Sequence, residues 1–246
     1  MEIAILAAAG CGTALATGIG AIPVSMLAKR AEDWRPVLWG LTIGLMGVAS
    51  VLGLLLPALD EGAVLTVAVG CATGVLFLLV SRRALSGRDV HVSGLSGAGV
   101  QRSVLVFAVL FVHSLPEGLA IGTAFASDTQ GLGLFVILAI ALQNVPEGTA
   151  TAIPMEAAGF SRVQQFWAAV LTSAPQPVGA LVAYALVQQV AALLSFSFAF
   201  AAGAMLALVV VELVPQALRS THRPRAAVGC LLGGGLMALL AVSLGV

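Results

Sequence analysis

The chain has 246 residues, of which 60% are hydrophobic and only 9% are charged. A soluble domain carries about 25% charged residues, so eleven basic and eleven acidic side chains are too few to cover a globule of this size. These values exclude a water-soluble fold, and a formal net charge of zero without a Lys/Arg-rich block gives no reason to expect a nucleic-acid partner. We predict an all-α membrane protein that crosses the bilayer repeatedly.

Eight apolar segments are separated by charged and turn residues, and each is long enough to cross a bilayer, which takes about 20 residues. In chain order the predicted spans are about 3–28, 36–58, 63–81, 103–126, 131–155, 163–190, 194–218 and 226–246. Together they form a single transmembrane domain over residues 1–246. The longest connection, 82–102, is rich in Gly and Ser, and we expect it to be a flexible cytoplasmic loop.

The basic residues predict the orientation of the chain. All eleven Lys and Arg residues lie in loops that follow odd-numbered spans, and these loops are cytoplasmic by the positive-inside rule. Both termini are then extracytoplasmic. The acidic residues of the loops on that side are Asp60, Glu61 and Asp128. They could raise the local concentration of cations at an entrance, although ordinary solvated loop charges explain them more simply.

Three carboxylates lie inside the predicted spans: Glu117, Glu147 and Glu212. Each costs at least ~2.5 kcal/mol at the centre of the bilayer unless something compensates its charge. Because every Lys and Arg is placed in a loop, no span offers a cationic partner. The carboxylates are therefore protonated, or they hold a cation from outside the chain. Glu212, near the cytoplasmic end of span 7, is either a gate or exit ligand or a hydrogen-bonded protonated acid.

Two of these carboxylates belong to a duplicated frame, polar-polar-apolar-Pro-Glu-Gly, at 113–118 in span 4 and again at 143–148 in span 5. In each frame the first and fifth residues are four positions apart and share one helical face. These residues are His113, Glu117, Gln143 and Glu147. The frame's proline, Pro116 or Pro146, removes a backbone hydrogen bond and should kink its helix. Two such helices can present an imidazole and hard oxygen atoms to one point, which suits a divalent transition metal such as zinc.

Other interpretations of the same residues remain open. A lone intramembrane histidine such as His113 can equally well make a helix–helix hydrogen bond. Glu117 and Glu147 could be proton carriers of a transporter for another substrate, but this leaves the spacing of the polar pairs unexplained. An intramembrane hydrolase needs a nucleophile beside a base, and His113 and Ser114 lie on different helix faces. We therefore do not expect an enzyme.

The segments HSLPEGLAIG in span 4 and QNVPEGTATAIP in span 5 resemble the paired signature helices of the ZIP family of divalent metal transporters. The second segment is similar to the bacterial GufA-like branch of that family. Further similarity lies in ATGIGAIP at 16–23 and in FAAGAM and VVVELVP within 200–215. The resemblance extends over essentially the whole chain.

This resemblance implies a 3+2+3 arrangement of eight helices, in which spans 1–3 and 6–8 form an inverted repeat around the metal-binding pair. It also implies passive or gradient-driven entry of metal into the cytoplasm, an elevator-type motion of spans 1, 4, 5 and 6 against the rest, and a homodimer. We expect the protein to reside in a bacterial inner membrane. Zinc, or else cadmium, iron or manganese, would be cargo and not a cofactor.

The resemblance also implies specific ligands. A first site uses the positions of His113, Glu117, Gln143 and Glu147, all of which suit a metal. A second site shares the glutamates and adds the positions of Ser114, Asn144 and Gln176. Ser114 and Gln176 stand where the family commonly has a better ligand and a carboxylate. We therefore expect one tightly held metal and a weak or absent second site. Val211 replaces the usual histidine before Glu212, which weakens an exit site.

Overall fold

A computed structural model describes residues 2–27, 31–85, 98–219 and 222–246 of the chain. Within these ranges the structure is helical and contains no strand. Eight helical stretches among the described residues are long and apolar enough to cross a membrane. The predicted all-α fold with eight spans is therefore confirmed.

The helices of the first four spans are α1 (Glu2–Leu27), α2 (Ala31–Ser50) with η2 (Val51–Leu55) and α3 (Leu56–Glu61), α4 (Val64–Leu85), and α5 (Ala98–Ala126). The last four spans are α6 (Leu132–Ala157), α7 (Arg162–Thr172) with α8 (Pro175–Gln189), α9 (Leu193–Leu208) with η3 (Val209–Leu213) and α10 (Val214–Arg219), and α11 (Arg223–Leu244). Of these, η2 and η3 are π-helical segments.

The predicted loop 82–102 is wrong at both of its ends. Helix α4 continues to Leu85 and α5 begins at Ala98, so only 86–97 lie outside the described residues. Arginine is a good helix former, and its long side chain can reach polar surroundings from a helix that continues past its apolar run. Arg82 and Arg102 are thus helical residues, whereas Lys29, Arg30, Arg88 and His91 lie outside the described residues.

Span 6 is divided into two helices. Helix α7 ends at Thr172 and α8 begins at Pro175, with a turn between them. Proline lacks the amide hydrogen that would continue a helix, but it is well suited to a helix's first position. By contrast, α5 remains helical through Pro116, and α6 remains helical through Pro146.

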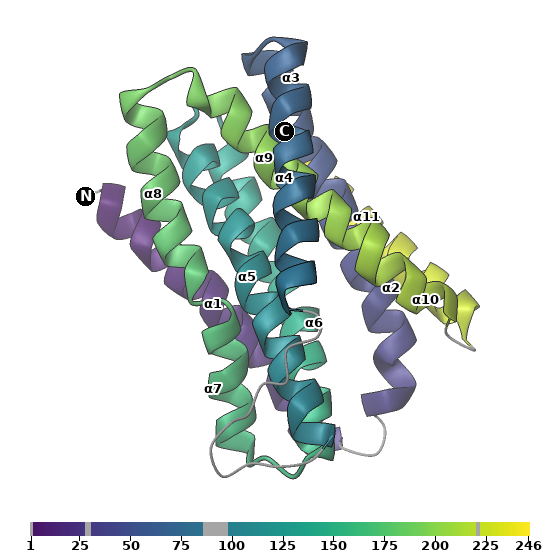
Figure 1. The fold of residues 1–246 in the computed structure, drawn as a ribbon. Coiled ribbons are helices and arrows are strands. Elements are labelled where there is room, and N and C mark those ends of the chain that lie inside the picture. The colour runs from purple at the N-terminus through teal and green to yellow at the C-terminus, as the bar shows by residue number, and fades with distance from the viewer. Residues whose placement is uncertain (1, 28–30, 86–97, 220–221) are drawn as a thin grey trace.

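The helices pack in two groups; in Figure 1, α1, α7 and α8 of one group lie on the left, and α2, α10 and α11 of the other lie on the right. In the first group, α1 packs along α6 and α5 packs along α8, while α7 contacts α1 and α6. In the second group, α2 packs along α11 and α4 packs along α9. The groups meet chiefly where α5 contacts α9 and where α2 contacts α6. Spans 1, 4, 5 and 6 therefore form one packed unit, and spans 2, 3, 7 and 8 form the other.

This packing has the symmetry expected of an inverted repeat. An inverted repeat relates span 1 to span 6, 2 to 7, 3 to 8 and 4 to 5. Under this exchange the pair α1–α6 becomes α8–α5, and the pair α2–α11 becomes α9–α4. The two π-helical segments, η2 and η3, also lie in the exchanged spans 2 and 7. The pairing agrees with the predicted 3+2+3 arrangement.

The glycine of each Pro-Glu-Gly frame lies where two helices of the first group approach closely. A Cβ atom at Gly148 would lie 1.7 Å from the carbonyl oxygen of Thr17 in α1, and one at Gly118 would lie 2.4 Å from that of Gln176 in α8. Only glycine allows this backbone approach, as small residues commonly do between membrane helices. The glycines thus set the separation of the helices that carry the frames.

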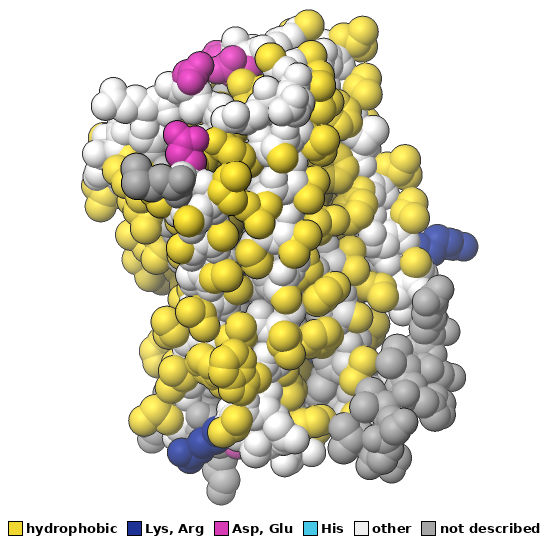
Figure 2. Space-filling view, turned by 90° about the vertical axis from the view of Figure 1, so that its left-hand side faces the viewer, with side chains coloured by type: hydrophobic (Ala, Val, Ile, Leu, Met, Phe, Trp, Pro, Cys, Tyr) yellow, Lys and Arg dark blue, Asp and Glu magenta, His cyan; other side chains and the backbone are white. Residues whose placement is uncertain are grey.

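The surface is suited to lipid. Hydrophobic side chains cover most of the height of the face in Figure 2, and acidic side chains gather at its upper end. Leu65, Leu231 and Val242 are each at least three-quarters exposed, as lipid-facing residues of a spanning helix would be. These features are those of an integral membrane protein.

Candidate metal site

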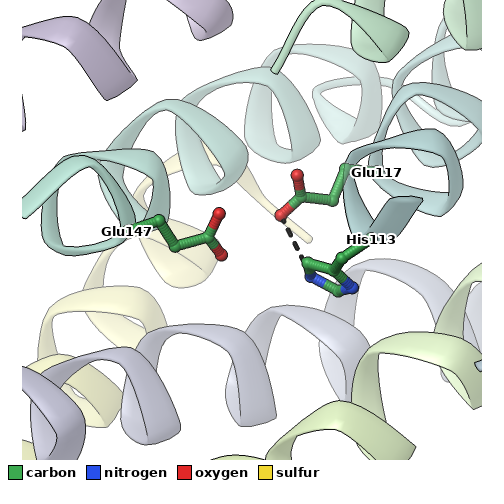
Figure 3. A group of neighbouring side chains, drawn as sticks. All are labelled: His113, Glu117 and Glu147. Carbon is green, nitrogen blue, oxygen red and sulfur yellow. Dashed lines mark ion pairs between the residues drawn. The ribbon is translucent and has the colours of Figure 1, made fainter. Parts of the chain in front are cut away.

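Three predicted ligands meet between α5 and α6. His113 and Glu117 point from α5 toward Glu147 of α6 (Figure 3). One potential ligand atom from each residue lies within 4.8 Å of those of the other two. His113 and Glu117 are fully buried and Glu147 is 5% exposed. The duplicated frames thus converge as the spacing predicted.

Gln143 completes this group. Its Nε2 donates a hydrogen bond of 2.5 Å to Oε1 of Glu117, and its own carbonyl oxygen Oε1 is buried without a hydrogen-bond partner. Nε2 of His113 lies 3.5 Å from the same Glu117 oxygen, too far for a good hydrogen bond.

The group has more unsatisfied polar atoms than a folded interior normally tolerates. Both ring nitrogens of His113, Oε1 of Gln143 and Oε1 of Glu147 are buried and lack a hydrogen-bond partner. Buried polar atoms are usually paired, because an unpaired one costs the free energy of its lost hydration. An imidazole, two carboxylates and an amide oxygen are suitable ligands for a divalent transition metal.

Two of the three residues predicted for a second site, Asn144 and Gln176, form a hydrogen-bond network. Gln176 Nε2 donates to Oε2 of Glu117 at 2.7 Å and to Oδ1 of Asn144 at 3.2 Å. Asn144 Nδ2 donates to the carbonyl oxygen of Thr13 at 2.7 Å and to Oε1 of Gln176 at 3.0 Å. Ser114 is buried, and its hydroxyl has no hydrogen-bond partner. Gln176 therefore holds the second oxygen of Glu117, and Asn144 holds Gln176 in turn.

The residues of α1 and span 6 that support this network were not predicted from the sequence. Thr13 supplies a backbone carbonyl, and Thr17 Oγ1 lies 2.7 Å from Ser173 Oγ at the break between α7 and α8. All three side chains are buried. Their hydroxyl groups in otherwise apolar segments are the only sequence signal that could have pointed to them.

The prediction that Glu212 has no cationic partner is wrong. Nε of Arg82 lies 2.7 Å from Oε1 of Glu212. The pairing forms because α4 continues past the apolar end of span 3 and packs along span 7. No Lys or Arg forms such a pair with Glu117 or Glu147 within the described ranges.

A cavity of about 360 Å³ leads away from the central group. Glu147 lines it together with Pro146 and Ile153, and Glu212 lines it from span 7. Three arginines also line the cavity: Arg35, Arg82 and Arg102.

The acidic residues predicted at an entrance lie elsewhere. Asp60 and Glu61 are at the end of α3, and Asp128 is in the connection between α5 and α6. All three are exposed, and none of them lines this cavity. Their exposure is compatible with solvated charges, and the entrance role stays a prediction.

Several known proteins have sequences similar to this chain. The family profile described as ZIP zinc transporter matches residues 87–241, which is more than half of the chain. The chain belongs to the ZIP family. It is therefore a transporter of metal ions and not an enzyme.

The similarity of individual ZIP relatives extends well beyond that match. The chain is 34% identical to the zinc transporter GufA of Myxococcus xanthus, with all of both chains aligned. It is 34% identical to the zinc transporter ZIPB of Bordetella bronchiseptica, over 94% of this chain and 78% of the relative. It spans only 33% of a longer Arabidopsis thaliana relative, to which it is 32% identical.

Proposed function

We propose that this ZIP protein carries zinc into the cytoplasm, and that His113, Glu117, Gln143 and Glu147 bind the ion during transport. The observation that supports this most directly is the set of buried, unpaired nitrogen and oxygen atoms on three of these side chains, those of His113, Gln143 and Glu147. A zinc ion would accept their lone pairs and compensate the two carboxylates. The names of the relatives, which describe zinc transporters, favour zinc over cadmium, iron or manganese.

A single ion fits the electrostatics of the site. Gln176 offers an amide where a second ion would need a negative ligand, and its donated hydrogen bond occupies Oε2 of Glu117. Two carboxylates balance one dication but leave two dications with a net charge of +2. Gln176, itself held by Asn144, instead orients Glu117, as residues around a metal's ligands commonly do.

The packing supports an elevator-type motion. Both ligand helices, α5 and α6, belong to the group formed by spans 1, 4, 5 and 6, while spans 2, 3, 7 and 8 pack mainly with one another. Movement of the first group as a body would carry the site with its ligands intact. The cavity that Glu147 lines opens among helix ends that carry arginines, which is the cytoplasmic side in the proposed orientation.

The assembly and location are those implied by the resemblance to the ZIP family and by the placement of the basic residues. We place the protein in a bacterial inner membrane, with both termini extracytoplasmic, and we expect it to function as a homodimer. Crosslinking in native membranes would test the dimer, and labelling of cysteines introduced near each terminus would test the orientation.

Uptake of radioactive zinc into proteoliposomes tests the ligand assignment. Glu147→Gln removes one ligand charge with little change in volume, and uptake should fall to the level of empty vesicles. Asp33→Asn makes the same carboxylate-to-amide change at an exposed position outside the predicted sites and serves as the control. Unchanged uptake by Glu147→Gln would refute the assignment, and anomalous scattering from zinc-soaked crystals would count the bound ions directly.

A further inference from the structure

The ion pair between Arg82 and Glu212 lies on the route from the central site to the arginine-bearing side. The two side chains line the same cavity as Glu147, and Nε of Arg82 is 2.7 Å from Oε1 of Glu212. The side chain of Arg82 is 42% exposed and that of Glu212 is 23% exposed. An ion leaving Glu147 through this cavity therefore meets Glu212 as its next carboxylate.

Glu212 would make a cation site if it were not paired. Gln216, four residues further along span 7, lines the same cavity and could add an amide oxygen. Such a pair of oxygen ligands attracts a dication in a partly buried place, where water screens charge less than it does in bulk. A second holding site at this point would delay the release of the transported ion.

Glu212 also lies on a segment that can adjust. It belongs to η3, the π-helical segment Val209–Leu213 between α9 and α10. Single π-helical turns inside α-helices often occur at functional sites. The guanidinium of Arg82 is at the end of a long flexible side chain on the neighbouring span 3. The ion pair can therefore open by rotation of this side chain alone.

We propose that Arg82 acts as a tethered cation that occupies Glu212 between transport events, so that the departing metal ion is not retained there. The guanidinium and the metal ion compete for one carboxylate, and the tethered group wins after each release because it cannot diffuse away. Arg82 is thus a positioning residue for metal release. This inference rests on the proposed transport route.

The first test compares the kinetics of zinc uptake by the wild-type chain and by Arg82→Gln, each reconstituted in proteoliposomes. In Arg82→Gln, retention at Glu212 should lower kcat and KM together by about tenfold, which corresponds to about 1.4 kcal/mol of added affinity. The ratio kcat/KM should stay constant. Loss of folded protein alone would lower kcat at unchanged KM, and that result would overturn the proposal.

The double variant decides whether the effect passes through Glu212. Arg82→Gln combined with Glu212→Gln should recover most of the wild-type kcat, because the carboxylate that would retain the metal ion is absent. If the double variant is as slow as Arg82→Gln, then Arg82 acts through other contacts and the proposal is wrong.

A binding experiment separates this proposal from the proposed function. Cadmium NMR on the purified chain carrying Glu147→Gln, which disables the central site, should show no cadmium at Glu212 while Arg82 is present. Adding Arg82→Gln should produce a new cadmium resonance, and adding Glu212→Gln should remove it. Absence of that resonance would refute the role of Arg82 even if zinc uptake is confirmed, and its presence would support that role even if uptake fails.

Discussion

A methyl group added at Gly148 should disable the metal site without touching a ligand. The new Cβ would lie 1.7 Å from the carbonyl oxygen of Thr17 and 2.7 Å from its carbonyl carbon. Ordinary Cβ contacts begin at about 3.4 Å, so α1 and α6 would have to separate by roughly 1.7 Å at this point. Neither partner atom is the end of a flexible side chain, so only a backbone shift relieves the overlap.

The consequence for binding follows from the position of Gly148 next to Glu147. Metal–ligand distances are tolerated within about 0.2 Å, and the required shift is several times larger. We expect Gly148→Ala to weaken zinc binding by about 100-fold, the upper end of the range seen when a metal ligand loses its support. Overpacking of this kind should also lower the free energy of unfolding by about 3 kcal/mol or more.

The assay is zinc titration calorimetry on purified protein, with thermal unfolding measured in parallel. Gly12→Ala is the matched control, since Gly12 lies in α1, is exposed, and has nothing within 4 Å of an added Cβ. It should bind zinc as the wild type does. Wild-type affinity in Gly148→Ala would refute the reasoning that close helix approach positions Glu147.

Three further predictions concern the side chains around the site. Gln176→Glu places a third carboxylate beside Glu117, so calorimetry should count two zinc ions instead of one, and the metal-free protein should unfold at a lower temperature. His113→Asp replaces the nitrogen ligand with a hard oxygen, so the ratio of zinc to manganese uptake should fall. Thr17→Val leaves the buried hydroxyl of Ser173 unpaired and should lower the free energy of unfolding by about 1–3 kcal/mol.

Each of these has a result that contradicts it. A zinc stoichiometry of one in Gln176→Glu would mean that the missing carboxylate does not limit the number of ions. If the ratio of zinc to manganese uptake is unchanged in His113→Asp, then the imidazole of His113 is not a metal ligand. For Thr17→Val the control is Thr73→Val, because Thr73 bonds only to carbonyl groups of its own helix; equal unfolding temperatures for the two variants would show that the contact with Ser173 contributes nothing.

The sequence by itself determined the membrane fold and the central site. A chain with so few charges cannot be covered for water, and its apolar segments match the thickness of a bilayer. The duplicated Pro-Glu-Gly frame predicted which polar side chains share a face of each helix, because positions four apart lie on one side of a helix. These properties depend on composition and on spacing within single helices, which are fully present in the sequence.

Only the tertiary structure decided what each polar group contacts across helices. Gln176 could be assigned to a second metal site by resemblance, but its amide donates to Glu117 because the break before Pro175 brings α8 beside α5. Arg82 was placed in a loop, yet helix α4 carries it to Glu212 in span 7. Such contacts join residues more than fifty positions apart, and the packing of the helices, which no local pattern encodes, selects them.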